Sequence, residues 1–283
     1  MSGSGVTRWR SLLFVPGNRP DLAAKATRSS PDAVVVDLED AVPAGAKAAA
    51  RTVAVEAVAG LVAEGADVVL RVNPPATEWF AGDVALLPLA GLAAVIVPKL
   101  ETAAEVDAVA AAVGGLAVVA GIETVRGVVD ARALLAAGAV DGCYFGAEDY
   151  TVDLGGRRTA SNAEVAVARA TVAMAARLAG VPAFDMITAD FGHADRFTAE
   201  AAGARDLGYA GKLCIHPAQV ALANAAFTPS DDEVERATRL LAAYDAAVAG
   251  GRAAVAFEGS MVDEVIARQA RAVIALRSAA PPG

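Results

Sequence analysis

The feature that most constrains the fold is a repeated alternation of short apolar runs with longer alanine-rich segments. Eight runs rich in Val, Ile and Leu occur between residues 11 and 217, and most are followed by a stretch with helical spacing. Near-continuous apolar strands need both faces covered, as in a parallel sheet wrapped by helices. The pattern therefore predicts an α/β fold, a TIM (β/α)8 barrel. The runs cover 11–17, 33–40, 67–73, 93–100, 116–124, 142–150, 182–191 and 209–217.

The pattern changes after Thr228. Ser230 and an acidic first turn predict the start of one amphipathic helix, and a last helix is expected over 265–279. We therefore expect a catalytic barrel domain over residues 1–228 and a C-terminal helical extension over 229–283. The extension is too short to fold alone, so it is expected to pack on its own barrel or on that of a neighbouring subunit.

Composition excludes several classes of protein. The 283 residues carry a formal net charge of −9, which argues against nucleic acid as a partner. No uninterrupted apolar stretch approaches the roughly 20 residues of a membrane span. The first ten residues lack the apolar block of a secretory signal, and Cys143 and Cys214 lie in apolar runs, so we expect reduced, buried thiols in a cytoplasmic protein. With two histidines and no CxxC motif, any metal is expected to have oxygen ligands.

Charged side chains concentrate at the C-terminal ends of the apolar runs. Because these ends gather on one face of a parallel barrel, the pattern predicts an active site there. A single acid at such a place is as readily explained as the N-cap of the next helix. Almost every run, however, has a charged residue at its C-terminal end. The residues concerned are Asp37, Glu39, Asp40, Arg71, Lys99, Glu123, Glu148, Asp149, Asp190 and His216.

Two of these acids suggest a metal site. Glu123 lies near the end of the fifth run and Asp149 near the end of the sixth, so adjacent strands would bring both carboxylates to the barrel mouth. Two carboxylates completed by substrate oxygens are a common way to hold Mg²⁺. The alternative is a solvated pair of helix caps. Glu148, beside Asp149, is expected to brace the site through hydrogen bonds.

The basic residues allow two interpretations each. Arg71 ends the third run and is suited to grip a carboxylate with parallel hydrogen bonds, although a salt bridge to Glu39 or Asp40 is equally compatible with its position. Arg19 and Lys25 open the first helix and are suited to an anionic group such as phosphate, or to a solvated helix face. His216 is a weaker candidate, because a lone histidine at a strand end is more often a structural hydrogen-bonding residue.

These residues lie within motifs that resemble the citrate lyase β-subunit-like group of the HpcH/HpaI aldolase superfamily, Mg²⁺-dependent acyl-CoA lyases built on this barrel. The resemblance runs from about Ser11 to about Ile274, and the motifs occur in the family's order. They are LLFVPGNRPD (12–21), VVVDLEDAV (34–42), RVNP (71–74) with Trp79 after it, VPKLE (97–101), GIETVRG (121–127), FGAEDYTVDLGG (145–156), KLCIHPAQV (212–220) and FEGSMVDE (257–264).

The resemblance assigns a role to each candidate residue. It implies that Glu123 and Asp149 bind Mg²⁺ or Mn²⁺, with Glu123 also near the substrate, and that Arg71 binds the substrate carboxylate. Asp263 in the tail would transfer a proton in its own site or in that of an adjacent subunit of a homo-oligomer, a trimer or hexamer. Contacts to the CoA or acyl-donor end and to the thioester arm are implied for Phe14, Arg19, Lys25, Ile215 and His216.

The implied reaction cleaves, or forms, a carboxylated 3-hydroxyacyl-CoA such as malyl-CoA or citramalyl-CoA, giving acetyl-CoA or a homologue and a 2-oxo acid. The partners are thus small molecules, a CoA thioester and a 2-oxo acid. Three alternatives stay open: a class II aldolase for free 4-hydroxy-2-oxo acids, a malate or citramalate synthase that also hydrolyses the thioester, and a non-catalytic barrel that binds CoA esters. Met186, Ile187 and His193 depart from the family pattern in a segment expected to shape the acyl pocket.

Overall fold

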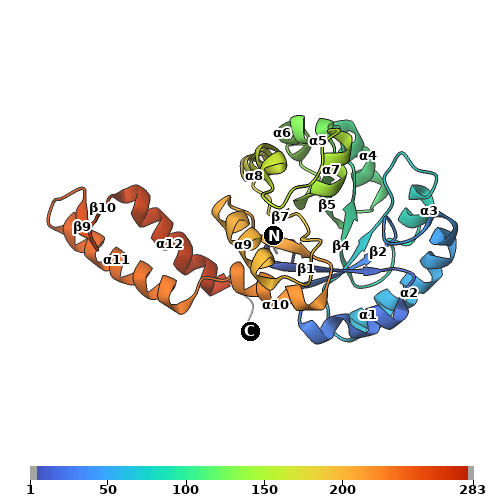
Figure 1. Cartoon of the computed structure of the whole chain (residues 1–283), viewed down its shortest axis with the longest axis horizontal. Helices are drawn as coiled ribbons and strands as arrows, with labels where there is room; N and C mark the ends of the chain where they lie inside the picture. The colour runs from blue at the N-terminus through green and yellow to red at the C-terminus, as the bar shows by residue number, and fades with distance from the viewer. Residues whose placement is uncertain (1–4, 280–283) are drawn as a thin grey trace. The chain divides into compact units, whose positions relative to one another are not determined.

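The computed structural model describes residues 5–279 and contains a closed barrel of eight parallel strands, as the alternation predicts (Figure 1). Each strand pairs with its neighbour in chain order, and the first closes the barrel on the eighth. The strands are β1 Ser11–Pro16, β2 Ala33–Asp37, β3 Val68–Arg71, β4 Leu92–Val97, β5 Ala117–Ile122, β6 Gly142–Phe145, β7 Ala183–Asp185 and β8 Gly211–Cys214.

Helices surround the barrel, in the arrangement that lets strands be apolar on both faces (Figure 1). The α-helices of this part are α1 Pro20–Ala26, α2 Lys47–Ala63, α3 Phe80–Val84, α4 Ala103–Ala112, α5 Val125–Val129, α6 Ala131–Leu135, α7 Ala147–Asp153, α8 Ala166–Ala179, α9 Ala194–Asp206 and α10 Pro217–Ala226. The 3-10 helices are η1 Gly5–Arg8, η2 Thr27–Ser29, η3 Ala44–Ala46 and η4 Ala163–Val165.

The barrel interior is filled by alternate residues of the strands, among them Leu12, Val35, Val69, Ile96 and Val119. All five are completely buried, so the barrel is a packed core and leaves room for ligands only at its ends. Both cysteines are free and buried, as their apolar surroundings predict. Among residues 5–279, no helix is long and apolar enough to cross a membrane.

All eight predicted runs extend past the strands that they contain, and the difference matters most for the sixth and seventh. β6 ends at Phe145, and Glu148 and Asp149 lie in the first turn of α7 rather than on the strand. β7 has only three residues, so Met186 and Ile187 belong to the loop that follows it. Acidic residues suit a helix N-terminus, and this explains why an apolar run is followed at once by two acids.

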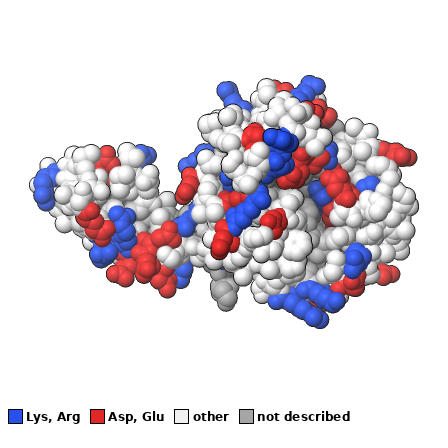
Figure 2. Space-filling model, in the orientation of Figure 1, with Lys and Arg blue, Asp and Glu red and all other residues white. Residues whose placement is uncertain are grey.

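A second compact unit begins at Ala225, after a first that ends at Asn224. It consists of α11 Asp231–Ala249, a hairpin of β9 Val255–Phe257 and β10 Ser260–Val262, and α12 Glu264–Ala279. α11 begins with the predicted serine cap, because Ser230 Oγ accepts the Glu233 N–H and Glu233 accepts the Ser230 N–H. On the face drawn in Figure 2, acidic and basic side chains are interspersed.

Candidate active site at the barrel mouth

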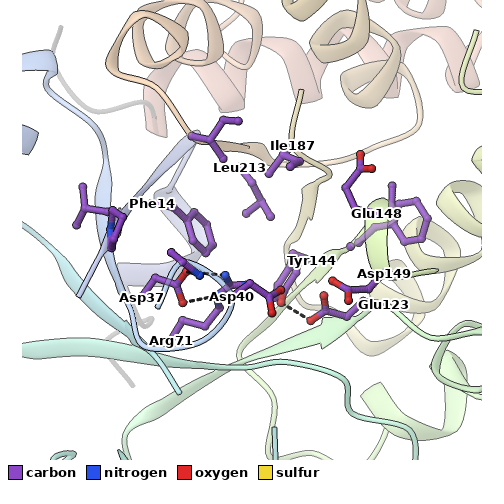
Figure 3. Close-up of a pocket in the computed structure, with 17 residues that line it drawn as sticks. Phe14, Asp37, Asp40, Arg71, Glu123, Tyr144, Glu148, Asp149, Ile187 and Leu213 are labelled. Carbon is purple, nitrogen blue, oxygen red and sulfur yellow. Dashed lines mark hydrogen bonds and ion pairs between the residues drawn. The ribbon is translucent and has the colours of Figure 1, made fainter. Parts of the chain in front are cut away.

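Five of the seven acids expected at the C-terminal face line one cavity of about 380 Å³, and they are Asp37, Asp40, Glu123, Glu148 and Asp149 (Figure 3). Strand register explains the convergence: Ile122 of β5 pairs with Phe145 of β6, so Glu123 emerges beside the start of α7, which carries Asp149. The lining combines polar side chains, Arg71 among them, with apolar ones. These apolar side chains are Phe14, Leu213 and Ile215 from β1 and the end of β8, and Ile187 from the loop after β7.

Arg71 is held in place by charged neighbours. Register pairs it directly with Asp37 on β2, whose two carboxylate oxygens accept hydrogen bonds from Nε and Nη2 at 2.8 and 2.6 Å. Nη1 lies 2.8 Å from Glu39, and the guanidinium carbon lies 5.1 Å from the centre of the Phe14 ring. Burial acts to lower the pKa of Arg71, but the two carboxylates raise it, so the side chain stays charged. The salt-bridge alternative is therefore present, with Glu39 and Asp37 rather than Asp40.

Arg71 nevertheless remains accessible from the cavity that it lines. Its bonds to Asp37 use two of the five N–H groups of a guanidinium. The internal ion pair and the binding of a substrate carboxylate are thus compatible. Asp37 and Glu39 fix the plane of the guanidinium in advance, which reduces the entropy cost of binding an anion.

Glu123 is almost fully buried, with 2% of its surface exposed. Its Oε1 accepts hydrogen bonds from the Tyr144 hydroxyl at 2.5 Å and from the Lys99 backbone N–H at 3.2 Å. Burial, followed by the nearby charge of Glu39, raises the pKa of Glu123 to about 8, against the opposing effects of Arg71 and Lys99. A carboxylate in this setting is ready to accept a cation that replaces its proton.

Close packing around Glu123 depends on glycine. A Cβ at Gly146 would lie 2.6 Å from Glu123 Oε2, and one at Gly121 would lie 2.5 Å from Oε1. Tyr144 was not identified from the sequence as a site residue, because it lies within an apolar strand. The signal that was available is its hydroxyl, which needs a partner when it is buried.

Lys99, at the turn after β4, is a second residue whose role the sequence did not reveal. Its ammonium lies 2.5 Å from Glu39, 3.3 Å from Asp149 and 3.8 Å from Asp40. Its backbone has a φ of 54°, in the left-handed region that residues with a Cβ seldom adopt. The turn thereby directs both the backbone N–H and the ammonium of one residue to the site.

These side chains form what we call the mouth cluster: Asp37, Glu39, Asp40, Arg71, Lys99, Glu123 and Asp149. Five acids face two bases, so the cluster has an excess of negative charge. The atoms that it offers to a metal ion are all carboxylate oxygens. Among residues 5–279, no group of three or more His, Cys, Asp or Glu side chains is arranged to hold a metal ion. Mg²⁺ commonly binds through one or two carboxylates and keeps waters and substrate oxygens as its other ligands. Glu123 and Asp149 therefore fit a magnesium site that a substrate completes.

Glu148 and Asp149 are adjacent but have different partners, Arg158 for Glu148 and Lys99 for Asp149. One oxygen of Glu148 accepts from Arg158 Nε at 3.0 Å, and Arg158 also contacts Glu164 and the sulfur of Met186. Glu148 thus contacts the loop after α7 and also lines the cavity, and the bracing of the site expected of it stays a prediction.

The structure does not place all the predicted ligand contacts in the cavity. Arg19 and Lys25 are exposed on or before α1, and Arg19 pairs with Asp21 at 2.7 Å. Among the described residues they are not part of the cavity lining. If Arg19 and Lys25 contact a bound ligand, they contact the part of that ligand that extends out of the cavity.

Ile215 and His216 have different surroundings although they are adjacent. Ile215 lines the cavity, and its N–H donates to Gln219 Oε1 at 2.8 Å. The His216 ring stacks on that of Phe191, with centroids 5.0 Å apart, and its Nδ1 accepts from the Ala218 N–H. His193, in the segment expected to shape the acyl pocket, is exposed and pairs with Asp190, whereas Ile187 of the same segment reaches the cavity.

Asp263 belongs to the second unit, where it caps α12. Its Oδ1 accepts the backbone N–H groups of Val265 and Ile266 at 2.9 and 3.2 Å. The hairpin before it turns at Glu258 and Gly259, with φ of 49° and 81°, and Glu258 pairs with Arg236 of α11. The tail motif thus encodes a tight turn followed by a helix cap, which fixes the position of the carboxylate within its own unit.

A closed (β/α)8 barrel with an oxygen-rich mouth beside a buried arginine defines the class of the protein, and comparison with known proteins identifies the family. Residues 10–217 match the family model of HpcH/HpaI aldolase/citrate lyase. A citrate lyase subunit beta-like protein from Deinococcus radiodurans is 49% identical over 273 residues, covering 94% of this chain and 96% of that protein. The chain belongs to the HpcH/HpaI aldolase/citrate lyase family, in its citrate lyase β-subunit-like group.

Two further relatives describe what members of the group bind or do. A (3S)-malyl-CoA thioesterase from Cereibacter sphaeroides is 33% identical over 277 residues, covering 95% of this chain and 97% of that protein. The protein CitE from Mycobacterium tuberculosis, in complex with magnesium, acetoacetate and coenzyme A, superposes with a TM-score of 0.83 and 32% identity, covering 96% of this chain and 98% of that one. The family resemblance and the barrel expected from the sequence are thereby confirmed.

Proposed function

We propose that the protein is a Mg²⁺-dependent carbon–carbon lyase that cleaves, or forms, a carboxylated 3-hydroxyacyl-CoA such as malyl-CoA or citramalyl-CoA. The observation that carries the proposal is the convergence of Arg71, Glu123 and Asp149 on one cavity that is also lined by apolar side chains. A carboxylate-binding cation, a site for a hard metal and an apolar surface are what an acyl chain bearing a carboxylate and a hydroxyl requires. The magnesium and coenzyme A bound by the relative from M. tuberculosis support the same assignment.

In this proposal Arg71 holds the carboxylate of the substrate. Asp37 and Phe14 keep the guanidinium in one orientation, so the hydroxyl-bearing carbon is presented in a fixed register. Glu123 and Asp149 would hold Mg²⁺, and Mn²⁺ is a plausible substitute. When bound, the ion would act as a Lewis acid on the oxygen where negative charge develops. The Tyr144 hydroxyl and the Lys99 N–H fix the orientation of Glu123.

Cleavage transfers two protons. The substrate hydroxyl loses its proton as the carbon–carbon bond breaks, giving the 2-oxo acid and the enolate of the acyl-CoA, and the enolate carbon then takes up a proton. We assign this second transfer to Asp263, in its own site or in that of an adjacent subunit. Contacts to the CoA or acyl-donor end are proposed for Phe14, Arg19 and Lys25, and contacts to the thioester arm for Ile215 and His216.

A thioesterase is a second candidate, because the relative from C. sphaeroides is a (3S)-malyl-CoA thioesterase. The same site would form or bind the acyl-CoA, and water would then attack the thioester carbonyl to release free CoA. Lyase and thioesterase activities are separable, since only the second produces a free thiol. The free-acid aldolase alternative uses the same metal site but needs no thioester.

The experiment that tests the proposal is incubation of the protein with Mg²⁺, acetyl-CoA or propionyl-CoA, and glyoxylate, pyruvate or oxaloacetate. New acyl-CoA, followed by chromatography, would support a lyase, and free thiol in addition would support hydrolysis. Turnover should disappear with a chelator and return with Mg²⁺. Pyruvate release from a 4-hydroxy-2-oxo acid without change in any CoA ester would overturn the proposal in favour of the aldolase.

The role of Asp263 needs a variant that preserves the helix cap. Asparagine is as good a capping residue as aspartate but cannot transfer a proton, so Asp263→Asn should fold normally, bind the CoA ester and lose at least about 100-fold in kcat. Glu264→Gln, next in the chain, removes the same charge and serves as the control. Full turnover in Asp263→Asn would exclude this residue from proton transfer.

A further inference from the structure

Lys99 is the one base of the mouth cluster that contacts both proposed metal ligands. Its backbone N–H donates to Glu123 Oε1, and its ammonium lies 3.3 Å from Asp149 Oδ1. The same ammonium lies 2.5 Å from Glu39, which in turn pairs with Arg71. Lys99 therefore connects the proposed metal site to the arginine that would bind the substrate carboxylate.

The position of the ammonium does not follow from ordinary backbone preferences. Lys99 is one of four non-glycine residues with positive φ among residues 5–279. A non-glycine residue keeps a left-handed backbone conformation only when contacts with its surroundings hold it there. Here those contacts are three carboxylates, Glu39, Asp40 and Asp149, from the segment after β2 and from α7. The turn thus places a permanent positive charge among acids that would otherwise repel each other.

A positive charge at this place has a consequence for any divalent cation. An ion held by Asp149 would lie within a few ångströms of the Lys99 ammonium, and like charges repel strongly at that distance. Only 27% of the Lys99 side chain is exposed, so solvent screens the repulsion less than on an open surface. Asp40, which is 60% exposed and 3.8 Å away, offers the ammonium an alternative partner beside Glu39.

We propose that Lys99 is a positioning residue that sets the affinity of the mouth cluster for its divalent cation. Without the cation, the ammonium neutralises Asp149 and Glu39 and keeps the carboxylates in place. With the cation, Lys99 gives up its contact with Asp149 and remains with Glu39 and Asp40. The inference rests on the proposed magnesium site. It implies that the free protein holds the cation weakly and that an anionic substrate, which adds negative oxygens, completes a tighter site.

The test is a titration of the substrate-free protein with Mn²⁺, in which electron paramagnetic resonance measures the free ion. Lys99→Met should bind Mn²⁺ about tenfold more tightly than the wild type, because the competing charge is gone. Lys99→Arg keeps the charge and should stay within about twofold. Arg132→Met, at an exposed position of α6, loses one positive charge away from the mouth and should leave the affinity unchanged.

A purely structural role for Lys99 predicts a different outcome, namely lower stability with equal or weaker Mn²⁺ binding, and that outcome would overturn the inference. If Lys99→Met fails to fold because Glu39 loses its partner, Lys99→Gln carries the same expectation and retains an N–H donor for Glu39. Mn²⁺ binding by the wild type with no gain in either variant would overturn this inference alone. No Mn²⁺ binding by the wild type would overturn the proposed metal site as well.

Discussion

Two clusters of charged side chains lie in the same barrel and differ in their balance. The mouth cluster has five acids and two bases, and five of its seven members line the cavity. The second, which we call the β7–β8 cluster, consists of Arg169, Asp185, Glu200 and Lys212, all at most 9% exposed. Here two acids face two bases: Asp185 pairs with Arg169 and with Lys212 at 2.7 Å each, and Lys212 lies 3.7 Å from Glu200.

The difference in balance appears in the pKa values of two glutamates. Burial acts to raise the pKa of Glu200, but hydrogen bonds from Thr188 and Asn162 and the charge of Lys212 bring it below its ordinary value. Burial and the charge of Glu39 instead raise the pKa of Glu123 to about 8. Buried charges that satisfy one another serve the fold, whereas an unbalanced group beside a cavity is available for a ligand. The predictions below test this contrast.

The largest effect is expected for Asp149→Asn, which removes one proposed metal ligand from the unbalanced cluster. Turnover should fall by at least about 10³-fold, in line with the loss of a major electrostatic contribution to the transition state. The thermal midpoint of the metal-free protein should change little, because the side chain is 37% exposed. Asp153→Asn, on the same helix, is the control, and activity close to wild type in Asp149→Asn would remove Asp149 from the metal site.

The balanced cluster should respond in the opposite way. Lys212→Met leaves Asp185 without one of its two partners in a fully buried place, and such a loss costs about 3–5 kcal/mol of the free energy of unfolding. Urea unfolding measures the change, with Arg177→Met at an exposed position of α8 as the control. A loss below about 1 kcal/mol, or a specific loss of Mn²⁺ binding at unchanged stability, would contradict a structural role.

The pH dependence of stability should distinguish the two glutamates. Between an unfolded pKa of 4.5 and a folded pKa of about 8, folded Glu123 keeps a proton that the unfolded chain releases. Stability of the metal-free protein should therefore fall as pH rises through this window, by up to about 1.4 kcal/mol per pH unit. Glu123→Gln should remove this contribution, and Mg²⁺ should oppose it by favouring the carboxylate.

For Glu200 the sign is reversed, because its folded pKa lies below the unfolded value of 4.5. Its stabilising contribution is present above that value and is lost as pH falls through the folded pKa. Glu200→Gln should therefore lower stability at neutral pH and flatten the acid side of the profile. Thermal melts from about pH 2 to 8 with and without Mg²⁺ measure both effects, and identical profiles for the two variants would argue against the contrast.

The smallest effect concerns the apolar lining of the cavity. Ile187→Ala should enlarge the space for the acyl group and shift the ratio of kcat/KM for propionyl-CoA over acetyl-CoA by about tenfold in favour of the larger thioester. Val152→Ala, at an exposed position of α7, is the control. An unchanged ratio would place the acyl group elsewhere.

Much of the site was predictable because barrel topology brings strand ends together. Glu123 and Asp149 were predicted from their places after adjacent strands, and the structure brings them to one cavity. Tyr144 was missed as a site residue, and Lys99 was expected at the active-site face without a specific role. Tyr144 lies within an apolar strand, where its hydrogen bond to Glu123 could not be predicted. The role of Lys99 depends on a left-handed backbone conformation that a lysine in the sequence does not indicate.

The sequence by itself determined the eightfold alternation, the face where charged residues gather and the family, since these depend on periodicity and on motif order along the chain. Only the tertiary structure decided which charges balance one another. In the sequence Asp37 is one of several acids, and only the strand register shows that it pairs with Arg71. Lys212 lies in an apolar run, and only the packing shows that it pairs with acids. Charge balance depends on distances of a few ångströms between residues far apart in the chain, and only the folded barrel sets those distances.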